Sequence, residues 1–242
     1  MENKQRFLKD LILLNAETKN QRLKALAERR RNDAQTGLSK VYKQVGDFHA
    51  GIYDTWGHVS PWSKSACNVN SSVMVVAQDW TSEESAKKTP SNFELGYSPE
   101  LPTNKNLHCF LRDFFGLDFS DIYATNLFVF VKPGNLSARI PSKDLLYSAK
   151  TYTLQEIEIV KPRMVICLGA AAYNSLCKAI GVKNPNFKTS FLNPVEFKGT
   201  FIYGVPHTGG LGTKNAGGLS NVRDIWSRLA SQLRAQCPTS QI

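Results

Sequence analysis

Short, mostly apolar runs alternate along the chain with longer segments whose apolar residues keep helical spacing. The clearest run, V-M-V-V-A at 73–77, is rich in β-branched residues. Such a run is typical of a strand buried on both faces of a parallel sheet. Similar runs at 121–130, 164–168 and 200–205 predict three more strands of this kind.

The segments between these runs predict helices, because their apolar residues recur every three or four positions. Helices are expected at 107–114 with an end at Gly116, from Ser142 to a stop at Pro162, after Gly169, and from about Ser220. Polar loops are expected at 81–104 and 181–198. Strands that alternate with helices predict a three-layer α/β/α sandwich with a central four-stranded parallel sheet.

Residues 2–33 are predicted to form one long helix, since they contain neither proline nor glycine. Its second half is strongly basic, with Lys19, Arg22, Lys24, Arg29, Arg30 and Arg31. This basic stretch is either a solvated helix face laid on the domain or an arm that contacts phosphates. The expected organisation is therefore an N-terminal basic helical extension over 1–45 and an α/β/α domain over 46–242.

The net charge of the chain indicates what kind of partner it binds. It carries 30 Lys and Arg against 20 Asp and Glu, a formal charge of +10 over 242 residues, which favours nucleic acid as a partner. No apolar run is long enough to cross a bilayer, and no signal peptide is recognised, so no membrane partner is expected. Five scattered cysteines without a C-x-x-C suit a reducing, cytoplasmic location.

Three polar residues mark the predicted strands where ligands of open α/β sheets bind, at the carboxyl ends. They are Asp79, Asn126 and His207. Other motifs do not fit. The glycine-rich segment 208–218 matches neither a phosphate-binding nor a dinucleotide-binding pattern, and no serine-hydrolase elbow is present.

Metal ligation is not expected either. His49, His58 and Cys67 lie near one another in sequence, but their spacing matches no known zinc pattern. Structural roles are the better interpretation of these histidines. We therefore expect no metal and no other cofactor.

Three short motifs, in order, resemble those of the uracil-DNA glycosylase superfamily. They are A-Q-D-W-T at 77–81, A-T-N at 124–126 and H-T-G-G-L at 207–211. The best-known branch of that family has G-Q-D-P-Y, L-L-N and H-P-S-P-L in these places. The resemblance covers about residues 60–236. It implies a DNA glycosylase, active in base excision and DNA repair, that flips a pyrimidine out of DNA and hydrolyses its N-glycosidic bond.

Breaking that bond builds positive charge on the sugar and negative charge on the departing base. Asp79 is expected to stabilise the cationic sugar and to orient water. The resemblance implies that His207 donates a hydrogen bond to the base oxygen, for which a neutral imidazole suffices. Gln78, beside Asp79 in the first motif, is expected to take part in base recognition. Asn126 offers an amide that can recognise the paired edge of a pyrimidine.

An aromatic ring must stack on the flipped base. Tyr97 in L-G-Y-S best matches the stacking phenylalanine of the family, and Phe93 is the second candidate.

DNA contacts are implied for the third motif and the residues after it. Leu211 lies where the family places an apolar wedge that enters the duplex. Thr208, Gly209 and Gly210 are expected to bring backbone N–H groups close to phosphates, and Lys214 to add charge. The alternatives are a simple core contact for Leu211 and a flexible surface turn for the glycines.

The departures from the family concern substrate choice. Trp80 replaces a proline, and Thr81 replaces the tyrosine that excludes the thymine methyl by contact with the base. Loss of a wall weakens rejection of 5-substituted pyrimidines, although Trp80 refills some of the space. The expected substrate is uracil or a 5-modified pyrimidine; the alternative is a modified cytosine in phage DNA, which would make the protein a defence enzyme.

Two rival functions remain at this point. One is a DNA-binding member of the same fold without catalysis, and the other is an unrelated α/β hydrolase or transferase acting on a small metabolite. The presence of Asp79, Asn126 and His207 together favours a catalyst. We expect a monomer whose partner is double- or single-stranded DNA.

Overall fold

A five-stranded sheet forms the centre of the protein, in a computed structural model that describes residues 2–33, 38, 41–88 and 93–236. The strands are β1 (Val73–Asp79), β2 (Tyr123–Phe128), β3 (Met164–Leu168), β4 (Val195–Phe197) and β5 (Thr200–Val205). Their order is β2-β1-β3-β5-β4, and all neighbours are parallel except β4 and β5. The predicted parallel sheet is confirmed.

The count of four strands was one too few, because β4 lies within 181–198, where we predicted a loop. β4 pairs with β5 through a two-residue hairpin in which Phe197 lies opposite Thr200. Both hairpin residues have positive φ, 50° at Lys198 and 81° at Gly199. Two-residue hairpins of this type usually carry Asn or Gly at the first position, so a lysine there hides the signal.

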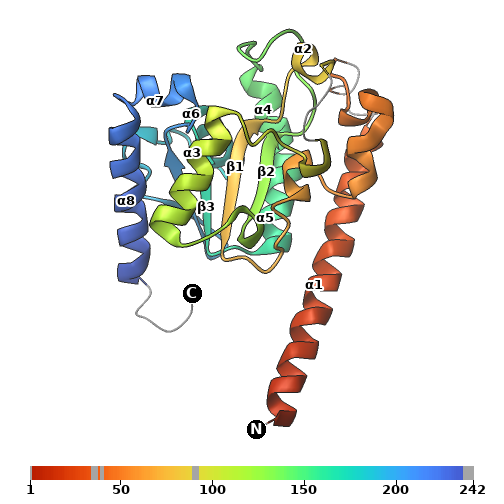
Figure 1. Cartoon of the computed structure of the whole chain (residues 1–242), viewed down its shortest axis with the longest axis vertical. Coiled ribbons are helices and arrows are strands. Elements are labelled where there is room, and N and C mark those ends of the chain that lie inside the picture. Colours follow the sequence, from red (N-terminus) through yellow and green to blue (C-terminus); the bar gives the residue numbers. More distant parts are fainter. Residues whose placement is uncertain (1, 34–37, 39–40, 89–92, 237–242) are drawn as a thin grey trace.

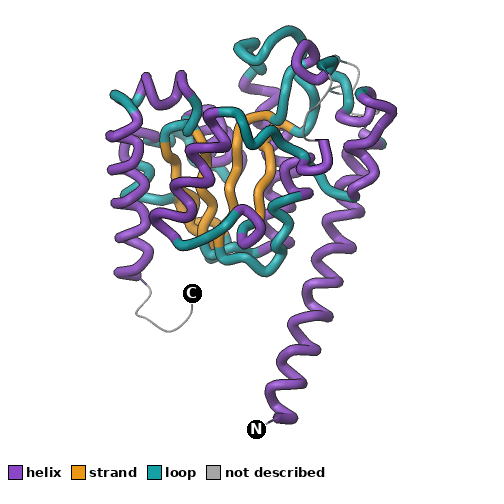
Figure 2. The backbone as a smooth tube through the Cα atoms, viewed as in Figure 1, coloured by secondary structure: helices purple, strands orange, loops and turns teal. Residues whose placement is uncertain are grey.

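Helices cover both faces of the sheet, as Figures 1 and 2 show. One face is covered by α3 (Pro102–Phe110) and α8 (Leu219–Gln236), and the other by α4 (Ser142–Ser148), α5 (Leu154–Val160) and α6 (Ala170–Ala179). Val75 and Ala77 of β1 point into the first layer, whereas Met74 and Val76 point into the second. This alternation confirms the α/β/α sandwich.

The predicted helix before Gly116 is present and longer than expected. A π-helical segment over Leu111–Phe115 continues α3, and Gly116 ends it with a left-handed φ of 68°. None of the helices in the described ranges combines the length and the apolarity needed to cross a bilayer.

The long helix α1 (Glu2–Arg31) is structural in its second half. Leu23, Leu26 and Ala27 join the hydrophobic core beside α5. Lys19 Nζ donates to the carbonyl oxygens of Val69 and Val160, each at 2.9 Å. The amino-terminal half extends beyond the body of the protein (Figure 1). The division of the chain at residue 45 stays a prediction.

The basic stretch of α1 is not wholly solvated. Arg30 is buried and pairs with Asp54, and it also donates to Gln44 Oε1 at 3.2 Å. With Lys19 also bonded, at least two of the six basic side chains named above hold the helix in place.

Short helical turns replace much of the predicted loop structure near the carboxyl edge of the sheet. α2 (Glu83–Ala86) and the 3₁₀ turn η5 (Phe93–Leu95) lie within 81–104, and α7 (Gly210–Asn215) lies within the glycine-rich segment. Before β1, the chain forms the 3₁₀ segments η3 (His49–Trp56) and η4 (Pro61–Lys64). Each turn is too short to show an apolar period, which is why the sequence predicted loops.

Candidate active site

A cavity of about 570 Å³ opens at the carboxyl edge of the sheet. Asp79 ends β1, His207 follows β5 by two residues, and Lys132 follows β2 by four. All three line the cavity. Five more of the predicted residues line it with them: Gln78, Trp80, Thr81, Tyr97 and Gly210. Parallel strands thus bring together side chains that lie far apart in sequence.

Both carboxylate oxygens of Asp79 are held. Lys132 Nζ lies 2.9 Å from Oδ2, and Gln78 Nε2 donates to Oδ1 at 2.8 Å. Both members of the ion pair are nearly buried, with 4% of the Lys132 side chain and 11% of the Asp79 side chain exposed. This arrangement fixes a carboxylate at the cavity wall, where it can stabilise a positive charge.

Lys132 is the functional candidate that the sequence analysis missed. We treated Lys132, Pro133 and Gly134 only as a turn that follows the second strand. The sequence carries only a weak signal: Lys132 directly follows the apolar run 127–131, and its contact with Asp79 is seen only in the fold.

The imidazole of His207 is held as a neutral donor. The backbone N–H of Gly209 donates to its Nδ1 at 3.0 Å, so that nitrogen carries no proton. Burial lowers the pKa of His207; Asp79 raises this pKa and Lys132 lowers it, both less strongly than burial. The proton of the neutral ring therefore resides on Nε2, which is left to donate a hydrogen bond.

The turn after His207 is pinned against α3. Thr208 Oγ1 donates to the carbonyl oxygen of Thr103 at 2.8 Å, and Asn106 Nδ2 donates to the Thr208 carbonyl at 2.7 Å. A Cβ at Gly209 would lie 2.5 Å from Thr103 Oγ1 and 3.0 Å from His207 Nδ1. Glycine is needed there for close packing, and the contacts of Thr208 and Gly209 with DNA stay predictions.

Asn126 lies in β2, buried rather than on the cavity lining. Its register partner is Ala77, which does line the cavity, so both side chains point to the same side of the sheet. Ser60 Oγ donates to Oδ1 at 2.6 Å, whereas Nδ2 has no hydrogen-bond partner among the described residues. A buried amide donor of this kind is suited to a ligand or to water.

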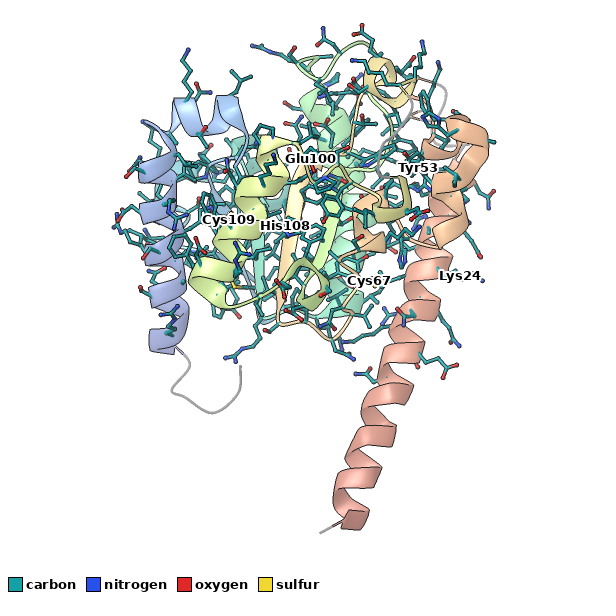
Figure 3. All side chains as sticks on the ribbon, in the orientation of Figure 1. Lys24, Tyr53, Cys67, Glu100, His108 and Cys109 are labelled. Atoms are coloured by element: carbon teal, nitrogen blue, oxygen red, sulfur yellow. The ribbon has the colours of Figure 1, made fainter. Side chains whose placement is uncertain are left out.

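Aromatic side chains form two walls. The Tyr97 ring stacks on His108 at 5.6 Å and packs against Phe119 at 4.8 Å. Trp80 donates from Nε1 to the Gly96 carbonyl at 3.0 Å and meets Tyr53 edge-on at 4.6 Å. Figure 3 labels His108 on α3 and Tyr53 on η3. Tyr97 is thus available to the cavity, whereas the side chain of Phe93 lies outside the described residues.

Leu211 lies in the first turn of α7 with 74% of its surface exposed. The interpretation as a core contact is therefore wrong. Its neighbour Gly210 lines the cavity, so an exposed apolar side chain lies beside the opening. Lys214 is also exposed on α7. Two further leucines at the lining, Leu101 and Leu136, are exposed as well.

The fold and this geometry define a class: an α/β/α protein whose sheet edge presents a fixed carboxylate and a neutral histidine donor to one cavity. The sequence model of the uracil DNA glycosylase superfamily matches residues 64–230. Because this match covers most of the chain, the protein belongs to that superfamily, and it has a domain of the DNA glycosylase type. No curated protein matches the chain. The match begins within η4, so α1 and η3 lie outside it.

Proposed function

We propose that the protein is a DNA glycosylase, which flips a pyrimidine out of DNA and hydrolyses the bond between the base and the sugar. One observation carries this proposal. A nearly buried carboxylate and a neutral imidazole donor, Asp79 and His207, line the same cavity. The reaction needs both, because it creates opposite charges on the two halves of one substrate.

In the proposed reaction the electrons of the C1′–N1 bond leave with the base. Asp79 stabilises the cationic sugar, and His207 donates from Nε2 to the base oxygen O2, which gains negative charge. The oxygen of a water molecule then forms the new bond to C1′, and the water releases a proton. Transfer of this proton to the departing base leaves the base neutral. His207 stays neutral throughout, a form that its lowered pKa favours over the imidazolium.

Base recognition is assigned to Asn126 and Tyr97. Since Ser60 occupies Oδ1 of Asn126, the amide offers its Nδ2 donor to the substrate. Such a donor matches an acceptor on the paired edge of a pyrimidine, for example O4 of uracil. Tyr97 supplies the stacking wall.

The order of the strands also indicates which side of the cavity the C5 edge of the base would face. His207 follows β5, and β2 lies on the opposite side of β1. A pyrimidine with O2 toward His207 therefore turns its C5 edge toward the β2 side, where Ser85, Leu136 and Tyr53 line the cavity. Cavities of roughly 300–1,000 Å³ hold drug-sized ligands, which are larger than a single pyrimidine ring. This cavity, at about 570 Å³, falls in that range.

We therefore extend the proposed substrates to 5-substituted pyrimidines, which Thr81 leaves room for at this edge. Modified pyrimidines of phage DNA are one source of such bases, and their excision would be a defence reaction. We propose a cytoplasmic, monomeric enzyme for either role.

The decisive experiment measures release of free base from duplexes and single strands carrying uracil, 5-hydroxymethyluracil or modified cytosines. Asp79→Asn keeps the shape of the side chain and removes its charge. We expect a loss of about 10²- to 10⁴-fold in single-turnover rate with DNA binding nearly unchanged. Asp113→Asn is the matched control, since Asp113 forms an exposed ion pair with Arg223.

The outcomes separate the rival functions. Binding to DNA without release of any base would identify a non-catalytic member of the fold. Indifference to DNA at low salt, where counterion release makes binding strongest, would favour an enzyme of small metabolites. Full activity of Asp79→Asn would show that the Asp79 carboxylate takes no part in the reaction.

A further inference from the structure

Lys132 places a positive charge in the part of the site where a cationic sugar would form. Its side chain is nearly buried, and its Nζ contacts Asp79 Oδ2 at 2.9 Å and the Leu136 carbonyl oxygen at 2.6 Å. Burying an ammonium group is unfavourable unless it is paired and hydrogen-bonded, as it is here. The ammonium also reduces the attraction of Asp79 for the sugar, so a compensating benefit is needed.

The benefit follows from the groups that surround His207. The described charged groups that act on the ring are Asp79 from β1 and Lys132 from the segment after β2. α3 contributes the uncharged Thr103 and Asn106 beside the turn, and the charged Lys214 of α7 is exposed. An unpaired Asp79 would favour the protonated imidazolium, which would lose the acceptor that binds the Gly209 N–H.

We propose that Lys132 is a positioning residue, which fixes the Asp79 carboxylate at the cavity wall and balances its charge so that His207 remains a neutral donor. This inference rests on the proposed glycosylase function for its meaning in catalysis. The charge relation itself belongs to the protein without substrate, so it is measured independently of any activity.

The first test is an NMR titration of the His207 ring in the free protein. Lys132→Met removes the ammonium and keeps an unbranched apolar chain. We expect His207 to titrate at higher pH than in the wild type, because the charge of Asp79 is then uncompensated. Lys132→Arg keeps the charge and should restore the wild-type titration. Lys198→Met is the control, since Lys198 forms an exposed pair with Glu158.

A double variant guards against loss of folding. Lys132→Met leaves Asp79 buried without its partner, which is strongly destabilising in other proteins. Asp79→Asn combined with Lys132→Met removes both charges together. If Lys132 acts through Asp79, His207 in the double variant should titrate closer to the wild type than in Lys132→Met. A double variant in which His207 titrates as high as in Lys132→Met alone would overturn the proposal.

The second test follows single-turnover base release across pH. For Lys132→Met we expect a loss of up to about 10²-fold that is larger at pH 6 than at pH 8, because misplacement of the carboxylate adds to protonation of His207. An equal loss at both pH values, with an unchanged His207 titration, would leave only a structural role and overturn the proposal. Borohydride trapping of abasic DNA on Lys132 would also overturn it, since the lysine would then be a nucleophile.

An inactive wild type has a different meaning. If no substrate is cleaved but His207 responds to Lys132 as expected, the charge relation holds and the proposed glycosylase function fails. If base is released but His207 titrates identically in all variants, the function holds and the role of Lys132 fails.

Discussion

Replacing Glu156 by Gln should remove a pH dependence of stability that arises beneath the site. Glu156 lies fully buried in α5, against the face of β2 opposite to Asn126. Tyr123 OH donates to its Oε1 at 2.7 Å and Thr125 Oγ1 donates to its Oε2 at 3.1 Å. Burial raises the pKa of Glu156 to about 8, and the two hydroxyl donors only partly oppose that rise.

The direction of this pH effect on stability follows from the proton that Glu156 keeps in the folded protein. Between pH 4.5 and about 8 the folded carboxyl stays protonated while the unfolded one ionises. The free energy of unfolding therefore falls as pH rises through this window and levels off above it. With about 1.4 kcal/mol for each unit of pKa difference, the full effect is on the order of 5 kcal/mol.

Gln should keep the two local hydrogen bonds, because an amide offers an acceptor oxygen and two N–H donors, one of which replaces the O–H of the protonated carboxyl. Tyr123 can still donate to the side-chain oxygen, and the Thr125 hydroxyl can rotate to accept. Urea unfolding at pH 5, 6, 7 and 8 measures the effect. We expect similar stability at pH 5 and a growing advantage of Glu156→Gln toward pH 8.

The comparison uses Glu158→Gln, a neighbour in α5 whose carboxylate pairs with Lys198 at the surface. This control should change stability little at any pH. Parallel pH profiles of wild type and Glu156→Gln would refute the reasoning, because the carboxyl would then be ionised in the folded protein. Success would show that β2, which carries Asn126, is tied to α5 by a neutral acid.

Two further predictions concern DNA. Leu211→Ala should slow base release from duplexes by about tenfold or more, because the apolar wedge is lost. The melting temperature of the protein should not change, since the Leu211 side chain is 74% exposed. Phe201→Ala, at the other end of the sheet, is the control. An equal rate for wild type and Leu211→Ala would exclude the wedge. Thr81→Tyr should retain uracil release but lose release of 5-substituted pyrimidines, as compared on paired oligonucleotides, and loss of both activities would instead indicate a collapsed cavity.

The parallel core was predictable because its strands are buried on both faces. A strand of this kind needs apolar residues at every position, so the runs at 73–77 and 164–168 stand out in the sequence. The edge strand β4 has no such requirement, and its three residues are only partly buried. Its pairing depends on a turn at Lys198 and Gly199 that no apolar pattern reveals.

Two residues of the candidate site were predictable because they lie at or just after the end of a strand. Asp79 and His207 follow their apolar runs closely, so the sequence alone pointed to them. Lys132 also follows an apolar run, but four residues separate it from the end of β2, and only the fold carries it back to Asp79. The burial of Asn126 beneath the cavity was also beyond the sequence, since it depends on Ser60 in the turn that begins η4.

The order of the strands explains how these groups take different places in the candidate site. Lys132 after β2 lies next to Asp79 of β1, whereas His207 after β5 is separated from β1 by β3. β3 ends at Leu168, and Gly169 follows it beside His207. Its φ of 91° disfavours any other residue, and a Cβ there would meet the Cβ of His207 at 3.5 Å. The sheet thus keeps the cation beside the carboxylate and places the neutral donor two strands away from it.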